Sequence, residues 1–167
     1  HSFDLTHLPV FDAGVNDVWL VYSTGVAEGD PLTAYVRVSD SRTSLAYKLM
    51  WSDGGVVVIG LGRFGKSLAL ELERDGVEVL GVDTDARRVQ SLAGRITHVV
   101  QADSTDVEAM QQLSVQDFDR AVIAIGSDLE ASALTAFALK SLGVENIWAK
   151  ATSESMAKIL EQIGVGH

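Results

Sequence analysis

Residues 56–65 read Val-Val-Val-Ile-Gly-Leu-Gly-Arg-Phe-Gly, and Asp83 ends a second apolar run downstream. The first four residues predict a buried strand, and the glycines after them predict a tight turn that leads into a helix. Gly62 is expected to let the backbone approach a phosphate, and Gly65 to let the helix pack closely on the sheet. An acid roughly 20 residues beyond such a loop can accept ribose hydroxyls. Together these features predict a site for a dinucleotide or another adenine nucleotide.

The composition describes an acidic chain without cysteine that is large enough to bury a core. Of its 167 residues, 47% are hydrophobic, and the formal net charge is −10. This charge argues against a nucleic-acid-binding protein, which needs a basic face. The lack of cysteine excludes a disulfide framework, a thiolate nucleophile and a cysteine-ligated zinc site.

Neither a membrane span nor a signal peptide is expected from the sequence. No apolar run approaches the roughly 18 residues of a membrane-spanning helix, so direct insertion into a membrane is not expected. These features fit a cytoplasmic protein. The sequence begins at His1 rather than at a methionine, which indicates a fragment or a processed chain.

From Gly55 onward, apolar runs alternate with helical patterns, as in α/β proteins with a parallel sheet. The expected strands are 56–59, 77–82, 97–102, 120–125 and 146–150, and the expected helices are 64–74, 86–93, 107–113, 129–142 and 153–163. Ser127 or Asp128 is expected to cap the fourth helix. Right-handed crossovers then give a Rossmann-like sheet ordered 3-2-1-4-5, possibly extended, with helices on both faces.

Residues 1–54 do not continue this pattern. Segments 18–22 and 34–38 resemble strands, and 44–51 resembles a short helix, but no arrangement of reactive side chains is recognisable there. We therefore expect an N-terminal segment of unknown role, 1–54, followed by a Rossmann-like lobe, 55–167.

Several motifs of that lobe resemble the RCK/KTN (TrkA-N type) family, the nucleotide-binding regulators of potassium channels and of Ktr/Trk potassium uptake systems. They are Gly-Leu-Gly-Arg-Phe-Gly at 60–65, Ala-Ile-Gly at 124–126, Ile-Trp-Ala-Lys at 147–150 and Ile-Leu-Glu-Gln-Ile-Gly at 159–164. The resemblance covers about 55–165. It implies an adenine-nucleotide ligand (ATP, ADP or NAD(H)), homodimers that can assemble into a ring, and a membrane-embedded potassium-translocating partner. It also implies a cytoplasmic location at the inner face of the cell membrane.

The predicted nucleotide-binding residues lie in the loop 60–65 and at the ends of the later strands. Asp83 is the expected ribose acceptor and would disfavour a 2′-phosphate; the alternative is a solvated turn acid. In the resembling family, an arginine at the place of Arg63 reaches the terminal phosphates; a plain surface arginine is the alternative. The full predicted set is Gly60, Leu61, Gly62, Arg63, Phe64, Gly65, Asp83, Thr84, Asp103, Ser104, Ala124, Ile125, Gly126 and Lys150.

The remaining predicted residues lie after the third, fourth and fifth parallel strands. Asp103 and Ser104 would lie beside the adenine, but they fit helix capping equally well. Ala124, Ile125 and Gly126 would leave room for the ligand at the end of the fourth strand. Lys150 could meet a phosphate or a partner chain, or be simply solvated.

The predicted helix 129–142 is apolar almost all round, although covering one face of a sheet requires a single apolar stripe. Its second apolar face is expected to meet another protomer, and burial under residues 1–54 is the alternative. His98 lies in a predicted strand, where a packed histidine is more common than a metal ligand. No metal site is predicted.

Two classes of function remain in view. The first is a non-catalytic sensor in which nucleotide identity biases the conformation of a dimer that regulates a potassium transporter. The second is a small NAD-dependent oxidoreductase or another dinucleotide-binding module. A dehydrogenase needs a proton-transfer residue beside the nicotinamide, and no Tyr-x-x-x-Lys or Ser/His/Asp pattern is found. The sequence therefore favours the sensor.

Overall fold

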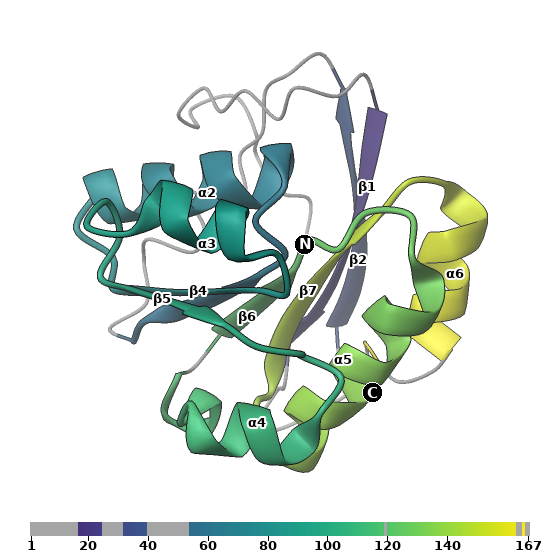
Figure 1. Cartoon of the computed structure of the whole chain (residues 1–167). Helices are drawn as coiled ribbons and strands as arrows, with labels where there is room; N and C mark the ends of the chain where they lie inside the picture. The colour runs from purple at the N-terminus through teal and green to yellow at the C-terminus, as the bar shows by residue number, and fades with distance from the viewer. Residues whose placement is uncertain (1–16, 25–31, 40–53, 119, 163–164, 166–167) are drawn as a thin grey trace.

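The computed structural model describes residues 17–24, 32–39, 54–118, 120–162 and 165. A parallel sheet is formed by β3 (Val56–Ile59), β4 (Val79–Asp83), β5 (His98–Gln101), β6 (Arg120–Ile123) and β7 (Asn146–Ala151). In space these strands run β5-β4-β3-β6-β7 (Figure 1). The predicted order 3-2-1-4-5 is therefore confirmed. From β3 the chain continues to β4 and β5 on one side of β3, and it then returns to form β6 and β7 on the other side. The strand order therefore reverses between β3 and β6.

Two further strands extend this sheet beyond β7. They are β1 (Asp17–Thr24) and β2 (Leu32–Ser39), which pair antiparallel with each other. β1 also pairs antiparallel with β7, with Leu20 opposite Lys150. The strands predicted at 18–22 and 34–38 are thus confirmed, and the sheet has seven strands. The helix predicted at 44–51 lies outside the described residues, and the division of the chain at residue 54 stays a prediction.

Helices cover both faces of the parallel strands. α2 (Arg63–Arg74) and α3 (Ala86–Leu92) lie on one face, and α4 (Val107–Gln112), α5 (Leu129–Ser141) and α6 (Glu154–Gln162) lie on the other (Figure 1). A short 3₁₀ turn, η1 (Val115–Asp117), follows α4. Because side chains alternate along β3, Val56 and Val58 join the core beneath α2, whereas Val57 and Ile59 join the core on the opposite face.

Polar caps fix where the helices on the second face begin. Asp106 caps α4 and accepts hydrogen bonds from the amides of Glu108 and Ala109. Asp128, the second of the two predicted candidates, caps α5 through the amide of Ala131. Both aspartates therefore place a carboxylate at a helix N-terminus, where the helix dipole favours negative charge.

The fourth parallel strand is shorter than predicted. β6 ends at Ile123, and the chain then leaves the ladder through a turn in which Gly126 has φ +87°. Ala124 and Ile125 therefore belong to the turn at the end of the sheet rather than to the strand.

No helix of the described residues has the length and apolar character needed to cross a membrane.

α5 buries one face and exposes apolar side chains on another. Its buried residues are Ser132, Thr135, Ala136, Ala138 and Leu139. Phe137 is 68% exposed and Leu134 is 47% exposed. The described part of the chain therefore leaves these two side chains exposed, and the alternative of burial under residues 1–54 falls mostly on residues outside it.

His98 is not packed as its predicted strand position suggested. It begins the edge strand β5 and is exposed, with Nε2 3.6 Å from Oε1 of Glu78. The predicted strand order already placed this strand at the edge of the sheet, where one face of a strand often meets solvent, so packing was the wrong expectation for His98.

Candidate functional site

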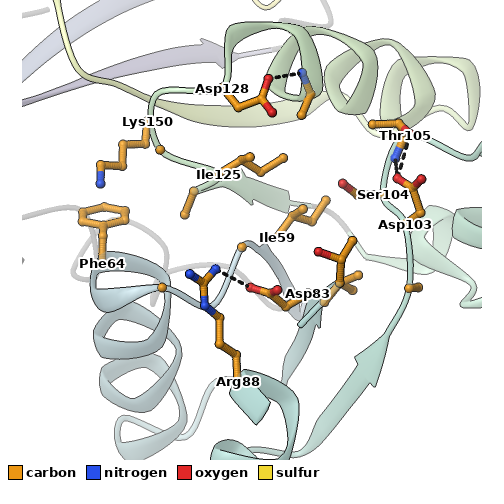
Figure 2. A pocket seen from close by; sticks show the side chains of 18 of the residues that line it. Ile59, Phe64, Asp83, Arg88, Asp103, Ser104, Thr105, Ile125, Asp128 and Lys150 are labelled. Carbon is orange, nitrogen blue, oxygen red and sulfur yellow. Dashed lines mark hydrogen bonds and ion pairs between the residues drawn. The ribbon is translucent and has the colours of Figure 1, made fainter. Parts of the chain in front are cut away.

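A pocket of about 440 Å³ opens at the carboxyl ends of the parallel strands, beside the point where the strand order reverses. Ligands of open α/β sheets bind in this position. The pocket is lined by Ile59, Gly60, Gly62, Arg63, Phe64, Val82, Asp83, Thr84, Arg88, Ala102, Asp103, Ser104, Thr105, Ala124, Ile125, Gly126, Asp128, Ala131 and Lys150. Figure 2 shows these side chains converging from the ends of successive strands and from the turns after them.

The glycine loop (residues 60–65) forms the wall beneath α2. Gly60 has φ +91°, and a Cβ there would lie 2.6 Å from the carbonyl oxygen of Ala124. A Cβ on Gly65 would lie only 1.7 Å from the carbonyl oxygen of Gly60, so this glycine permits α2 to pack against the turn. A Cβ on Gly62 would meet no protein atom within 4 Å, although Gly62 lines the pocket. Gly60 and Gly65 are therefore required for the packing of the turn and of α2. The absence of a side chain at Gly62 leaves space in the pocket that a ligand can occupy.

The first turn of α2 contributes a positive end to this wall. Gly62 is the N-cap residue, so no side chain caps the helix there. The dipole and the amides of a helix N-terminus attract anions, and phosphate groups are common ligands at such positions. Arg63, exposed at the first helical position, adds a full positive charge beside them.

Asp83 at the end of β4 is 7% exposed and held in place by three donors. Its Oδ2 accepts a hydrogen bond of 2.7 Å from the amide of Leu61, and its Oδ1 accepts one of 2.8 Å from the amide of Asp85. Arg88 approaches Oδ2 to 3.4 Å. The amide of Leu61 ties the glycine loop to the end of the neighbouring strand, so the carboxylate is fixed at the edge of the pocket.

The turn after β5 forms the opposite side of the pocket. The hydroxyl of Thr105, 2.7 Å from Asp103 Oδ1, and the backbone amide of Thr105 hold the pKa of Asp103 below its usual value. Asp103 is therefore an anionic acceptor at neutral pH. Ser104 is 7% exposed and forms a 2.7 Å hydrogen bond with Oγ1 of Thr135 on α5. This bond connects the pocket to the helix with the exposed apolar face.

Lys150 at the end of β7 closes the pocket near the glycine loop. Its Nζ lies 5.5 Å from the centre of the Phe64 ring, over which it points (Figure 2). Burial, and in second place the positive charge of Arg63, lowers the pKa of Lys150 below its usual value. Two like charges therefore face the same end of the pocket, and an anion there would relieve their repulsion.

The structure brings the predicted residues together, with two exceptions. Leu61 and Gly65 do not line the pocket; Leu61 orients Asp83 through its amide, and Gly65 allows the close packing of α2. The other predicted residues all line the pocket, and their role in binding a nucleotide stays a prediction.

The sequence reasoning missed several lining residues: Ile59, Val82, Arg88, Ala102, Thr105, Asp128 and Ala131. The apolar members lie at or beside the ends of β3, β4 and β5 and in the first turn of α5, so the positions of these elements determine their places. Arg88 had a partial signal in the sequence, because it lies in the first turn of the predicted helix that follows Asp83.

A parallel sheet with a glycine loop and a pocket at the reversal of strand order is the architecture of a dinucleotide-binding fold. The model of the TrkA-N domain family matches residues 56–167, and the chain belongs to this family. The resemblance inferred from the motifs is thereby confirmed.

Two relatives come from Bacillus subtilis (strain 168). Ktr system potassium uptake protein C is 43% identical over 110 residues, which cover 66% of this chain and 50% of the relative. Ktr system potassium uptake protein A is 44% identical over 107 residues, covering 64% and 48%. The chain thus spans about half the length of the curated relatives it matches.

Among solved structures, the NAD(P)-binding domain of an exopolyphosphatase-related protein from Archaeoglobus fulgidus is similar in fold. It superposes with a TM-score of 0.59 at 27% identity, covering 66% of this chain and 83% of that one.

Proposed function

We propose that this chain is a nucleotide-sensing regulatory domain of a potassium transport system. It binds an adenine nucleotide, ADP, ATP or NAD(H), in the pocket at the end of the sheet. Nucleotide identity then biases its conformation, and the change passes to a membrane-embedded potassium-translocating partner. The proposal places the chain in the cytoplasm, at the inner face of the cell membrane. The potassium partner is proposed because both relatives are named as potassium uptake proteins.

The observation that carries the nucleotide proposal is the distribution of charge along the pocket. Arg63, Lys150 and the start of α2 gather positive charge at one end, which suits phosphates. Asp83 offers a fixed acceptor for ribose hydroxyls. Asp103 offers an anionic acceptor for the exocyclic amino group of adenine. The name of the Archaeoglobus fulgidus domain, which specifies NAD(P) binding, supports the same ligand class.

We propose no catalytic role for the pocket. Proton transfer in dehydrogenases is usually carried by histidine or by tyrosine paired with lysine. Among the described residues that line the pocket, none is histidine, tyrosine or cysteine. A small NAD-dependent oxidoreductase is the second candidate, and hydride transfer from NADH to a simple carbonyl compound would favour it over the sensor.

The proposed signal leaves the pocket through α5. The buried Ser104–Thr135 hydrogen bond joins the turn beside the expected adenine to this helix. The outer face of the helix exposes Leu134 and Phe137, a pair suited to a second copy of the chain. A ligand that shifts the turn after β5 would therefore act on the dimer contact, in proportion to its different affinities for the two states.

Adenine nucleotides are expected to stabilise the protein against heat. A ligand that binds only the native state adds about 2.7 kcal/mol at one hundred times its Kd. ADP, ATP and NAD(H) should each raise the melting temperature by several degrees, and NADP should raise it less. Differential scanning fluorimetry measures these shifts, with GTP at equal concentration as the control for phosphate binding alone. Unchanged melting with all the adenine ligands would refute the nucleotide site.

Arg63→Ala is expected to weaken ATP binding about tenfold more than ADP binding. The reason is that a third phosphate brings charge within reach of the guanidinium, and charged hydrogen bonds are among the stronger ones. Isothermal titration calorimetry would give both Kd values. Arg74→Ala, at the other end of α2 and also exposed, is the matched control and should change neither. Equal losses of ATP and ADP affinity would mean that Arg63 supplies only a general positive field.

A further inference from the structure

Arg88 lines the pocket from α3 and faces the carboxylate expected to hold the ribose. Its Nη1 lies 3.4 Å from Asp83 Oδ2, and its Nε lies 4.0 Å from Asp85 Oδ2. The side chain is 54% exposed, so it is only partly withdrawn from solvent. Figure 2 shows the guanidinium rising from α3 toward Asp83 at the edge of the cavity.

Asp83 does not depend on Arg88 for its position. The amides of Leu61 and Asp85 already hold one oxygen each, at 2.7 and 2.8 Å. The contact with Arg88 is the longest of the three, and half-exposed ion pairs contribute little to stability. The guanidinium of Arg88 can therefore leave Asp83 and bind another anion with little loss of protein stability.

The position of Arg88 suits a phosphate on the ribose. If the ribose hydroxyls donate hydrogen bonds to Asp83, the 2′ oxygen of the ribose lies within hydrogen-bonding distance of this carboxylate. Arg88 contacts the same carboxylate, so its guanidinium lies close to the 2′ oxygen. A phosphate ester at that oxygen is repelled by Asp83, and a guanidinium fork beside it supplies two donors and a compensating charge. In dinucleotide-binding folds, an acid at this place holds the ribose 2′-hydroxyl of NAD, or an arginine nearby accommodates the 2′-phosphate of NADP; this pocket has both side chains.

We propose that Arg88 is a specificity-determining residue, and that it extends the ligand class of this pocket to 2′-phosphorylated dinucleotides such as NADP(H). This inference rests on the proposed function, since it concerns the ribose end of the same nucleotide site. Asp83 alone would disfavour NADP; with Arg88 beside it, the pocket should bind NAD more tightly than NADP by less than about tenfold.

The neighbouring arginine provides the comparison. Arg87 is one residue away on α3, and its side chain is 94% exposed. It pairs with Asp85 at 3.7 Å and does not line the pocket. Removing either arginine takes away one positive charge from the same helix, so the two variants differ in position and not in net charge.

Calorimetric Kd values for NAD and NADP, with the wild type, Arg88→Ala and Arg87→Ala, test the inference. Arg88→Ala should weaken NADP binding about tenfold or more and change NAD binding less than about threefold. Arg87→Ala should leave the NAD-to-NADP affinity ratio unchanged. Arg88→Lys, which keeps the charge and loses the fork, should lie between the wild type and Arg88→Ala. Melting temperatures without ligand establish that each variant is folded.

Different failures have different meanings. If the wild type binds NAD but NADP binds more than about tenfold more weakly, the inference is wrong and the proposed function stands. An equal loss for both ligands in Arg88→Ala, or the same ratio change in Arg87→Ala, also overturns the role of Arg88. If the wild type binds none of NAD, NADP, ADP and ATP, the proposed function fails and the inference falls with it.

Discussion

Gly62→Ala is expected to weaken adenine-nucleotide binding at least tenfold while the protein stays folded. The backbone at Gly62 has φ −66° and ψ −167°, which alanine adopts readily, and its Cβ would meet no protein atom within 4 Å. The free energy of unfolding should therefore change by no more than about 1 kcal/mol. The added methyl group would instead occupy the space through which a phosphate reaches the amides at the start of α2.

Gly65→Ala, three residues further on, should instead lower the stability of the fold. Its Cβ would lie 1.7 Å from the carbonyl oxygen of Gly60, so α2 would have to move away from the sheet. We expect a loss of about 3 kcal/mol in the free energy of unfolding, measured by urea titration.

If Gly62→Ala bound ADP as tightly as the wild type does, the glycine loop would not be the phosphate site.

The second large effect is expected at the outer face of α5. The wild-type chain should dimerise through the patch formed by Leu134 and Phe137, and Phe137→Glu should raise the dimer dissociation constant at least tenfold. Phe137 is 68% exposed, so the substitution should spare the fold, whereas a charge buried in the dimer contact would cost several kcal/mol. The monomer should still bind ADP, because Phe137 does not line the pocket.

Sedimentation velocity over a range of concentrations would measure this effect. Gln111→Glu on α4 is the control, since it adds the same charge at an exposed position of another helix. Leu139, which is fully buried, is unsuitable, because a glutamate there would disrupt the core. A wild-type chain that remains monomeric at high micromolar concentration would contradict the proposed dimer.

The order of the parallel strands and most of the pocket were predictable from the sequence because local signals and global topology agree there. The loop 60–65 and the apolar runs fix which strand ends converge, and right-handed crossovers then leave few arrangements. The pairing of β1 with β7 was not predictable, because antiparallel addition at a sheet edge leaves no mark in the sequence of either strand.

The roles of individual site residues were harder to predict than their places. Gly65 was correctly assigned to helix packing, since its position in the motif is defined by geometry. Arg88 was missed, because the reach of a long side chain from α3 to Asp83 depends on how the helix is set against the sheet. Leu61 acts through its backbone amide, a contribution that its side-chain type does not reveal.

The unequal strand pairing at the two ends of the pocket implies unequal local stability. β7, which carries Lys150, is hydrogen-bonded to β6 on one side and β1 on the other. β5, which leads to Asp103, is a four-residue strand that, among the described strands, pairs only with β4. Backbone amides of such a short edge strand exchange with solvent through small local openings, and those of an interior strand require larger ones. The Lys150 end of the pocket is thus held in shape more firmly than the Asp103 end. The Asp103 end is the part that ordering by a ligand can change more easily, and it is also the end joined to α5 by Ser104 and Thr135.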